Sequence, residues 1–191
     1  SGPTFVRDGT LRLGAHQALP AAGNLVLGDP NSAALAGVFD MDGYSQTAAR
    51  LFAATLTNNN ATVTNRVLNL APGQELAVVS GAADRFVQVQ MGAHLTLAGG
   101  GRLALTNTAG TVMIWGRHAT DWTSWHGLDA SGLGELHADV STITVGYDGG
   151  GEVQASRQAV LVLAETNTIR AATITIADSG RDGSIRGRVF L

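Results

Sequence analysis

The chain has 191 residues, of which 45% are hydrophobic and 14% charged, with a formal net charge of −3, 25 glycines and no cysteine. The basic residues form no stripe, which argues against a nucleic-acid partner. The lack of cysteine excludes disulfides and thiolate metal sites. No apolar run reaches the roughly eighteen residues that a membrane span needs. Aromatic residues are sparse, so Leu, Val, Ile and Ala must fill the core.

One short phrase recurs along the chain: an alternating apolar strand closed by glycine. It is clearest at 93–107, where strands predicted at 94–98 and 102–106 flank three consecutive glycines. One face of each strand is apolar at a period of two residues. Related phrases occupy 9–14, 23–28, 141–146 and 172–177. A chain that repeats one short strand and one glycine corner is typical of a stack.

The same pattern predicts about fifteen short strands. A longer segment, 47–56, is predicted as strand or short helix. The strands are expected at 10–13, 24–27, 37–41, 61–64, 67–70, 75–79, 86–91, 94–98, 102–106, 111–115, 135–140, 142–145, 160–163, 168–169 and 173–176.

These strands favour a single-stranded parallel β-helix (β-solenoid). Rungs of about 20–25 residues would give about eight rungs and a rod of about 40 Å. A β-sandwich is the alternative, although sandwiches usually have more aromatic residues and more two-residue hairpin signals. We expect one solenoid domain over 1–191. A projecting loop is expected at 116–133, where a longer, polar and aromatic sequence interrupts the repeat.

Part of the N-terminal third resembles a known repeat family. Residues 9–28 read GTLRLGAHQALPAAGNLVLG, and 39–51 read FDMDGYSQTAARL. Together they resemble the autotransporter-associated β-strand repeat of large bacterial surface proteins, although Met41 and Asp42 stand where that repeat usually has Leu and Asn. Residues 127–146 and 161–176 are similar, more loosely, to long bacterial surface β-helix proteins. The resemblance implies an extracellular or cell-surface location in a bacterium and a structural or adhesive role.

Two other functions remain open. Neither end has an obvious capping sequence, so the chain could be a filament subunit that stacks end to end with its own copies. It could also be a β-helix that binds or cleaves carbohydrate, with surface glycans as partners. The sequence starts at Ser1 with no signal or anchor pattern, and we expect a processed product or a segment of a longer protein.

Segment 115–129 is the richest in chemically versatile side chains, with all three tryptophans and two of the five histidines. Such residues can stack on sugar rings and hydrogen-bond their hydroxyls, or the tryptophans can simply pack on the side of the rod. The candidate ligand-binding residues are Trp115, His118, Asp121, Trp122, Trp125 and His126.

We expect no enzyme activity, metal or cofactor. His118, Asp121 and His126 have no recognised metal spacing, and 178–183 is an ordinary turn rather than a calcium loop. Asp40 and Asp42 lie on one side of a strand, as a catalytic pair would, but the surface repeat fills these positions without catalysis. The Thr-x-Thr pairs recur at irregular intervals, which argues against an ice-binding face.

Overall fold

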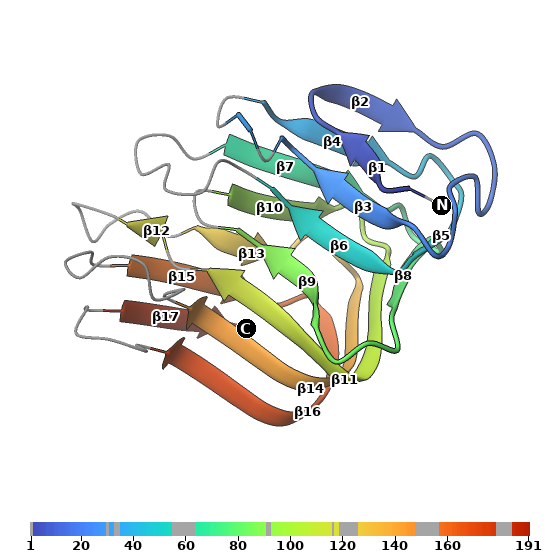
Figure 1. Ribbon diagram of the computed structural model, residues 1–191. Coiled ribbons are helices and arrows are strands. Elements are labelled where there is room, and N and C mark those ends of the chain that lie inside the picture. Colours follow the sequence, from blue (N-terminus) through green and yellow to red (C-terminus); the bar gives the residue numbers. More distant parts are fainter. Residues whose placement is uncertain are drawn as a thin grey trace.

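A computed structural model of the chain describes residues 2–29, 31–32, 35–54, 64–90, 93–115, 117–118, 126–147, 157–178 and 185–191. These residues contain seventeen strands in two sheets that wind as the stacked turns of a β-solenoid (Figure 1). Within the described ranges, the strand pairs are parallel except that of β12 with β15. The predicted all-β parallel β-helix is therefore confirmed. The described residues include no helix long and apolar enough to cross a membrane.

Each complete turn has three faces. Face 1 consists of β2 (Gly9–Arg12), β4 (Gly37–Asp40), β7 (Thr64–Asn69), β10 (Ala93–Ala98), β13 (Gly127–Asp129), β15 (Arg157–Val162) and β17 (Ile185–Phe190). Face 2 consists of β5 (Gln46–Ala48), β8 (Glu75–Val79) and the first halves of β11 (Arg102–Trp115), β14 (Glu135–Tyr147) and β16 (Thr166–Asp178). Face 3 consists of β1 (Thr4–Val6), β3 (Asn24–Leu27), β6 (Arg50–Ala53), β9 (Arg85–Val89) and the second halves of those three long strands. The two-residue β12 (Arg117–His118) pairs with β15.

Five turns carry strands on all three faces, fewer than the predicted eight. The difference comes from the length of a turn. Residues paired between successive turns lie from 21 positions apart (Phe5 with Val26) to 36 (Leu51 with Val87), because several connections between face 3 and face 1 are long. The seven strands of face 1 at about 4.8 Å spacing give a stack of about 29 Å.

The core consists of apolar rows that run from turn to turn. On face 3, one inward row is Leu25, Leu51, Val87, Val112 and Ile143, each at most 4% exposed. Outward neighbours alternate with these residues, as the predicted period of two requires. Burial of stacked Leu, Val, Ile and Ala side chains, with the backbone ladders between turns, therefore holds the solenoid together.

The repeated phrases form strands on different faces. Residues 9–14 contain β2 on face 1, whereas 23–28, 141–146 and 172–177 lie on face 3. In 93–107, the two predicted strands become β10 and the start of β11. The corner between them has Gly99 and Gly100 at φ +102° and +81°, a region that glycine adopts without steric cost.

The first turn is closed by the linker between β2 and β3. Backbone N–H groups of Leu13 and Gln17 donate to Asp40 O and Ser45 O, and Gln46, 1% exposed, hydrogen-bonds both the N–H and the carbonyl of Leu19. The linker thus occupies the face 2 position of this turn, and Val6 and Leu13 are buried. The sequence did not predict this cover.

The last turn is open. Ile174 and Ile176 continue two inward rows of face 3, yet they are 55% and 48% exposed. Their counterparts one turn earlier, Ile143 and Val145, are at most 4% exposed. Val189 and Phe190 of β17 are also exposed. Core positions in this turn therefore present an apolar edge.

Candidate functional site

An aromatic–arginine cluster, formed by Arg85, Trp115 and Tyr147, lies on the outer surface of face 3. The Trp115 and Tyr147 rings meet edge to face, with centroids 5.0 Å apart and planes at 87°. The Arg85 guanidinium carbon lies 5.8 Å from the Trp115 centroid and 5.0 Å from that of Tyr147. Arg85 Nη2 also donates to the Tyr147 hydroxyl over 3.4 Å. The guanidinium is thus held by two rings.

Strand register brings these three residues together from distant parts of the chain. Arg85 begins β9, Trp115 ends β11 and Tyr147 ends β14, and these three strands are neighbours in one sheet (Figure 1). Between β11 and β14 the register shifts by one residue, so that Trp115 lies opposite Tyr147 rather than Gly146. Gly146, the extra residue at this shift, has φ +88°, a conformation that glycine adopts without steric cost.

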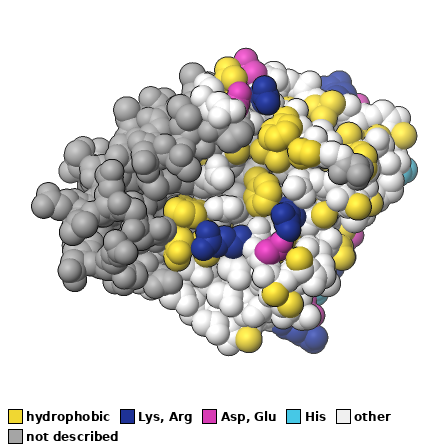
Figure 2. All heavy atoms as spheres, viewed as in Figure 1, with side chains coloured by type: hydrophobic (Ala, Val, Ile, Leu, Met, Phe, Trp, Pro, Cys, Tyr) yellow, Lys and Arg dark blue, Asp and Glu magenta, His cyan; other side chains and the backbone are white. Residues whose placement is uncertain are grey.

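The side chains beside the cluster are buried although they face away from the core. Met113 lies between the core residues Val112 and Ile114 and pairs with Thr144, yet Met113 and Thr144 are only 6% and 4% exposed. Such burial on an outer surface fits a cover formed by the cluster's long side chains. Figure 2 shows this face, where hydrophobic side chains gather in patches with basic and acidic groups among them.

Arg85 makes no ion pair with any described residue. The nearest acid in sequence, Asp84, is bound by Arg50. Trp115 Nε1 is buried and has no hydrogen-bond partner among the described atoms. Among the described residues, the positive charge of the cluster is therefore uncompensated, and it sits on an aromatic support, a combination that suits an anionic ligand.

The structure describes the side chains of two of the predicted ligand-binding residues, Trp115 and His126, and they have different neighbours. Trp115 belongs to the cluster, whereas His126 contacts His94, with ring centroids 6.1 Å apart. The backbone of His118 pairs with Arg157 in β12, and its side chain lies outside the described residues. Asp121, Trp122 and Trp125 also lie outside the described residues. Of the predicted projecting loop, Gly127–Asp129 forms β13 within face 1.

His94 and His126 form a second polar group, on face 1. His94 Nδ1 accepts a hydrogen bond from the backbone N–H of Gly127 over 3.1 Å. Burial lowers the pKa of His94 below its usual value, and the nearby Asp129 carboxylate opposes this in part. The neutral imidazole therefore ties β10 to the beginning of β13. This role is structural.

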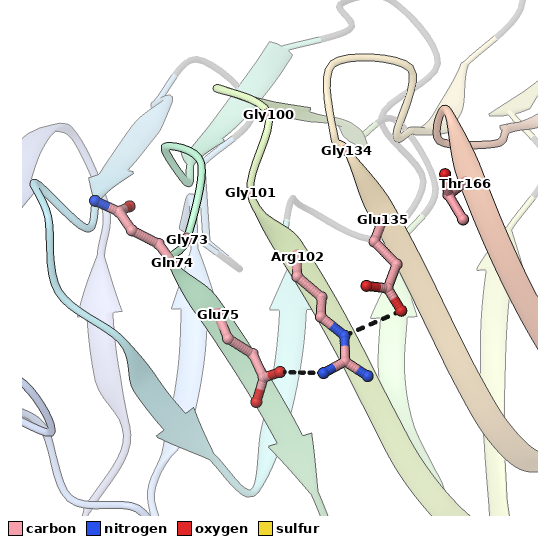
Figure 3. A pocket seen from close by; sticks show the side chains of 9 residues that line it. All are labelled: Gly73, Gln74, Glu75, Gly100, Gly101, Arg102, Gly134, Glu135 and Thr166. Carbon is pink, nitrogen blue, oxygen red and sulfur yellow. Dashed lines mark hydrogen bonds and ion pairs between the residues drawn. The ribbon is translucent and has the colours of Figure 1, made fainter.

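A third feature is a groove of about 420 Å³ at the corner between faces 1 and 2 (Figure 3). Glu75, Arg102 and Glu135 follow one another across three turns along it. Arg102 Nη1 donates to Glu75 Oε2 over 2.7 Å, and its Nε lies 3.2 Å from Glu135 Oε1, an ion pair without hydrogen-bond geometry. Glycines at the corner, which have no side chains, leave this space open. The charged groups of the groove pair with one another across the turns.

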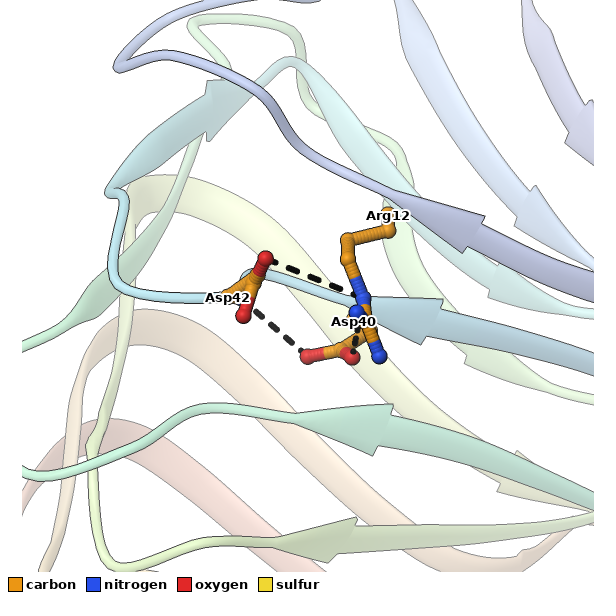
Figure 4. A network of polar contacts seen from close by, with 3 residues as sticks. All are labelled: Arg12, Asp40 and Asp42. Carbon is orange, nitrogen blue, oxygen red and sulfur yellow. Dashed lines mark hydrogen bonds and ion pairs between the residues drawn. The ribbon is translucent and has the colours of Figure 1, made fainter.

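Asp40 and Asp42 share one arginine. Arg12 Nε lies 3.1 Å from Asp40 Oδ2 and 3.7 Å from Asp42 Oδ2, and the Asp42 N–H donates to Asp40 Oδ1 over 3.1 Å (Figure 4). Asp42 has φ +43° and begins the tight turn with Gly43. Both carboxylates thus stabilise a turn and its neighbouring strand, and neither is a free acid or base in this arrangement.

No group of three or more His, Asp or Glu side chains suited to a metal ion occurs in the described part of the chain. The residues that sequence reasoning missed are Arg85, Tyr147 and His94. One signal pointed to Tyr147: TVMIW at 111–115 and TITVGY at 142–147 are similar strands that both end in an aromatic residue.

The fold and its outer cluster define a class of protein, a β-solenoid with a small cationic and aromatic surface site. Comparison of the chain with protein-family models, curated proteins and solved structures finds no match.

Proposed function

We propose that this chain is a structural and adhesive β-solenoid segment of an extracellular or cell-surface bacterial protein. The observation that carries the proposal is that most of the chain serves to stack turns. In the described residues, five complete turns share continuous inward rows of apolar side chains. Outward polar groups also link turns, as Glu75, Arg102 and Glu135 do. The aromatic–arginine cluster lies on the outer surface and not in an enclosed cavity. Such a site suits a scaffold that presents contacts better than it suits a catalytic centre.

The segments that resemble autotransporter repeats support the same proposal. They supply β2 to β6 and the linker that closes the first turn, so they build turns. Residues Asp40 and Asp42 within them serve a turn and an ion pair with Arg12. In this proposal, their sequence is explained by stacking alone, with no contribution to catalysis.

Surface labelling tests this proposal directly. Antibodies raised against the purified chain should label intact cells of the source organism, and external protease should remove the label while a cytoplasmic marker stays intact. Labelling that needs permeabilised cells would contradict the extracellular location. The purified chain should also adhere to surfaces that carry an acidic polysaccharide.

End-to-end self-association is a second candidate, favoured by the open last turn. The exposed Ile174, Ile176, Val189 and Phe190 would be covered by the first turn of another copy, with strand directions preserved. The first turn offers β1 on face 3 and β2 on face 1 as matching edges. Such a heterologous contact does not close and gives filaments.

Electron microscopy and sedimentation across a range of concentrations test this second candidate. Fibres of constant width are expected, and an Ile174→Lys, Ile176→Lys double variant should remove them because charges would then face the apolar edge. A Thr10→Lys variant introduces a charge at an exposed position of β2, on the opposite edge of the stack. It tests whether this edge takes part in fibre formation, in which case fewer fibres are expected. A monodisperse monomer at high concentration would exclude assembly.

A further inference from the structure

We infer that the aromatic–arginine cluster binds the carboxylate of an acidic polysaccharide. This inference rests on the adhesive role proposed above and names its ligand class. It differs from the sequence-based interpretation, because the binding group is Arg85 on a support of Trp115 and Tyr147 rather than a tryptophan loop.

The hydrogen-bond donors of Arg85 are available to a ligand. A guanidinium has five N–H donors in one plane, and a cation–π contact with a ring does not use these donors up. Arg85 uses one donor on the Tyr147 hydroxyl, and no described carboxylate pairs with it. Its side chain is exposed, yet two rings restrict it, so little conformational entropy is lost when a ligand binds. Two parallel N–H groups match the two oxygens of a carboxylate.

A second feature concerns the rest of the ligand. Thr111 pairs with Arg85 in the next strand, and Thr142 pairs with Thr111 one turn further, so hydroxyl groups continue the outward row that Arg85 begins. Trp115 and Tyr147 end the same two strands, four and five residues beyond these threonines, which corresponds to about 13 Å along the strand. Hydroxyl groups at one end and aromatic surface at the other complement an oligosaccharide, whose sugars have both hydroxyl and C–H faces. An oligosaccharide that also carries a carboxylate uses every part of the site.

The charge of the site argues against nucleic acid as the natural ligand. Nucleic-acid sites neutralise several phosphates with several basic residues. Within the described part of this site only Arg85 lacks a carboxylate partner, since its neighbour Arg50 pairs with Asp84, and the whole chain has a net charge of −3. A single guanidinium instead matches one carboxylate, such as that of a uronic acid residue within a polysaccharide.

Calorimetric titration of the full chain with galacturonate oligomers tests the inference, and the same oligomers after reduction of their carboxyl groups are the matched neutral ligand. Loss of a charge-assisted hydrogen-bond pair should weaken binding about tenfold or more, and this is the expected effect of both carboxyl reduction and Arg85→Gln. Trp115→Ala should weaken binding similarly, whereas Tyr147→Phe keeps the ring and should change affinity about twofold.

Arg12→Gln is the control, because Arg12 is also exposed but pairs with Asp40 on face 1, and it should leave the affinity unchanged. Thermal melting of each variant verifies that it is folded. Equal binding of acidic and neutral oligomers would overturn the inference while leaving glycan adhesion intact. Equal binding of polyglutamate would overturn it in favour of an acidic peptide. No binding of any oligomer at millimolar concentration would overturn both the inference and the glycan part of the adhesive role, whereas the surface-labelling result would still decide the location independently.

Discussion

The residue that ends each face 3 phrase has a left-handed backbone conformation. Gly28 and Gly146 have φ +87° and +88°, and Ala177, at the position matching Gly146 one turn later, has φ +65°. A residue with a side chain is strained in this region by about 1–2 kcal/mol. Replacement by glycine removes this strain, but part of the gain in stability is lost because glycine raises the conformational entropy of the unfolded chain. We predict that Ala177→Gly raises the free energy of unfolding by about 1 kcal/mol, as urea titration would measure.

Ala172→Gly is the matched control for this prediction. Ala172 begins the same phrase and has an ordinary negative φ, so glycine there should lower stability by about 0.5–1 kcal/mol. If both substitutions destabilise equally, backbone strain at Ala177 is not the cause.

Close packing constrains Gly28 further. A Cβ atom at Gly28 would lie 2.5 Å from both the Ala54 carbonyl oxygen and Arg66 Nε, in a region of φ that already disfavours it. Gly28→Ala should therefore lower the free energy of unfolding by about 3 kcal/mol, from strain and overpacking together. Gly14 ends the equivalent phrase on face 1 with open space around it, and Gly14→Ala should change stability by less than about 0.5 kcal/mol. Thermal melting of the two variants compares them directly.

At the scale of the strand, His94 links β10 to β13 only while its Nδ1 is unprotonated. Burial lowers its pKa below 6.5, so the unfolded chain binds more protons than the folded chain just below that pH. The stability contributed by neutral His94 is therefore complete above pH 6.5 and is lost as the pH falls through the lowered folded pKa. Asp129 on β13 opposes the shift, and His126 is the other titratable group facing it.

Urea unfolding at pH 7 and pH 5 tests this linkage against His94→Gln, which keeps a hydrogen-bond acceptor but does not titrate. We predict that the wild type loses more stability than the variant between these two values. Because every carboxylate titrates in both proteins, the difference between them reports His94 alone. Parallel pH profiles would show that the imidazole does not carry the effect.

The charge ladder of Glu75, Arg102 and Glu135 joins three turns on their outer surface. Each side chain is more than one-third exposed, so each ion pair contributes modestly. Arg102→Gln also leaves two carboxylates facing each other, and we predict a loss of about 1 kcal/mol at low salt. In about 1 M NaCl the loss should shrink, because the Debye length falls to about 3 Å. An unchanged loss at high salt would point to packing of the arginine stem instead.

Alternation of apolar residues predicted most strands, and β3 and β8 have the expected bounds. It could not predict which strands pair, because register depends on the length of the connections between faces. The predicted turn of about 20–25 residues was therefore too short, and Trp115 could be proposed without its partners. Arg85 lies 62 positions from Tyr147, a separation at which a single sequence has no contact signal.

Arg66 shows a second limit of the pattern. It lies opposite Leu95 in an inward row and is fully buried, and desolvation lowers its pKa to about 10. The alternation predicts strands at 61–64 and 67–70 and leaves Arg66 between them, whereas β7 runs through it from Thr64 to Asn69. The interior accepts this long polar side chain beside Gly28, where an added Cβ atom would lie 2.5 Å from Arg66 Nε.

At the scale of the whole molecule, the two ends differ. The first turn is closed by the linker that Gln46 binds, and Val6 and Leu13 are at most 4% exposed. The last turn leaves Ile174 and Ile176 about half exposed. In a solenoid each turn is stabilised only by its neighbours, so a turn with one neighbour and an open core opens first.

This difference predicts a gradient of amide hydrogen exchange along the stack. Amides of β17 and β16 should exchange first, and those of β10, β11 and the first half of β14 last, because the central turns are covered on both sides.

Exchange measured at low and high protein concentration also distinguishes a single solenoid from copies stacked end to end. If copies stack end to end, protection of β16 and β17 should rise with concentration and approach that of the centre, and Ile174→Lys, Ile176→Lys should abolish the rise. A gradient that is independent of concentration would mean that the open edge stays uncovered between copies, and a uniform pattern would mean that the stack unfolds as one cooperative unit.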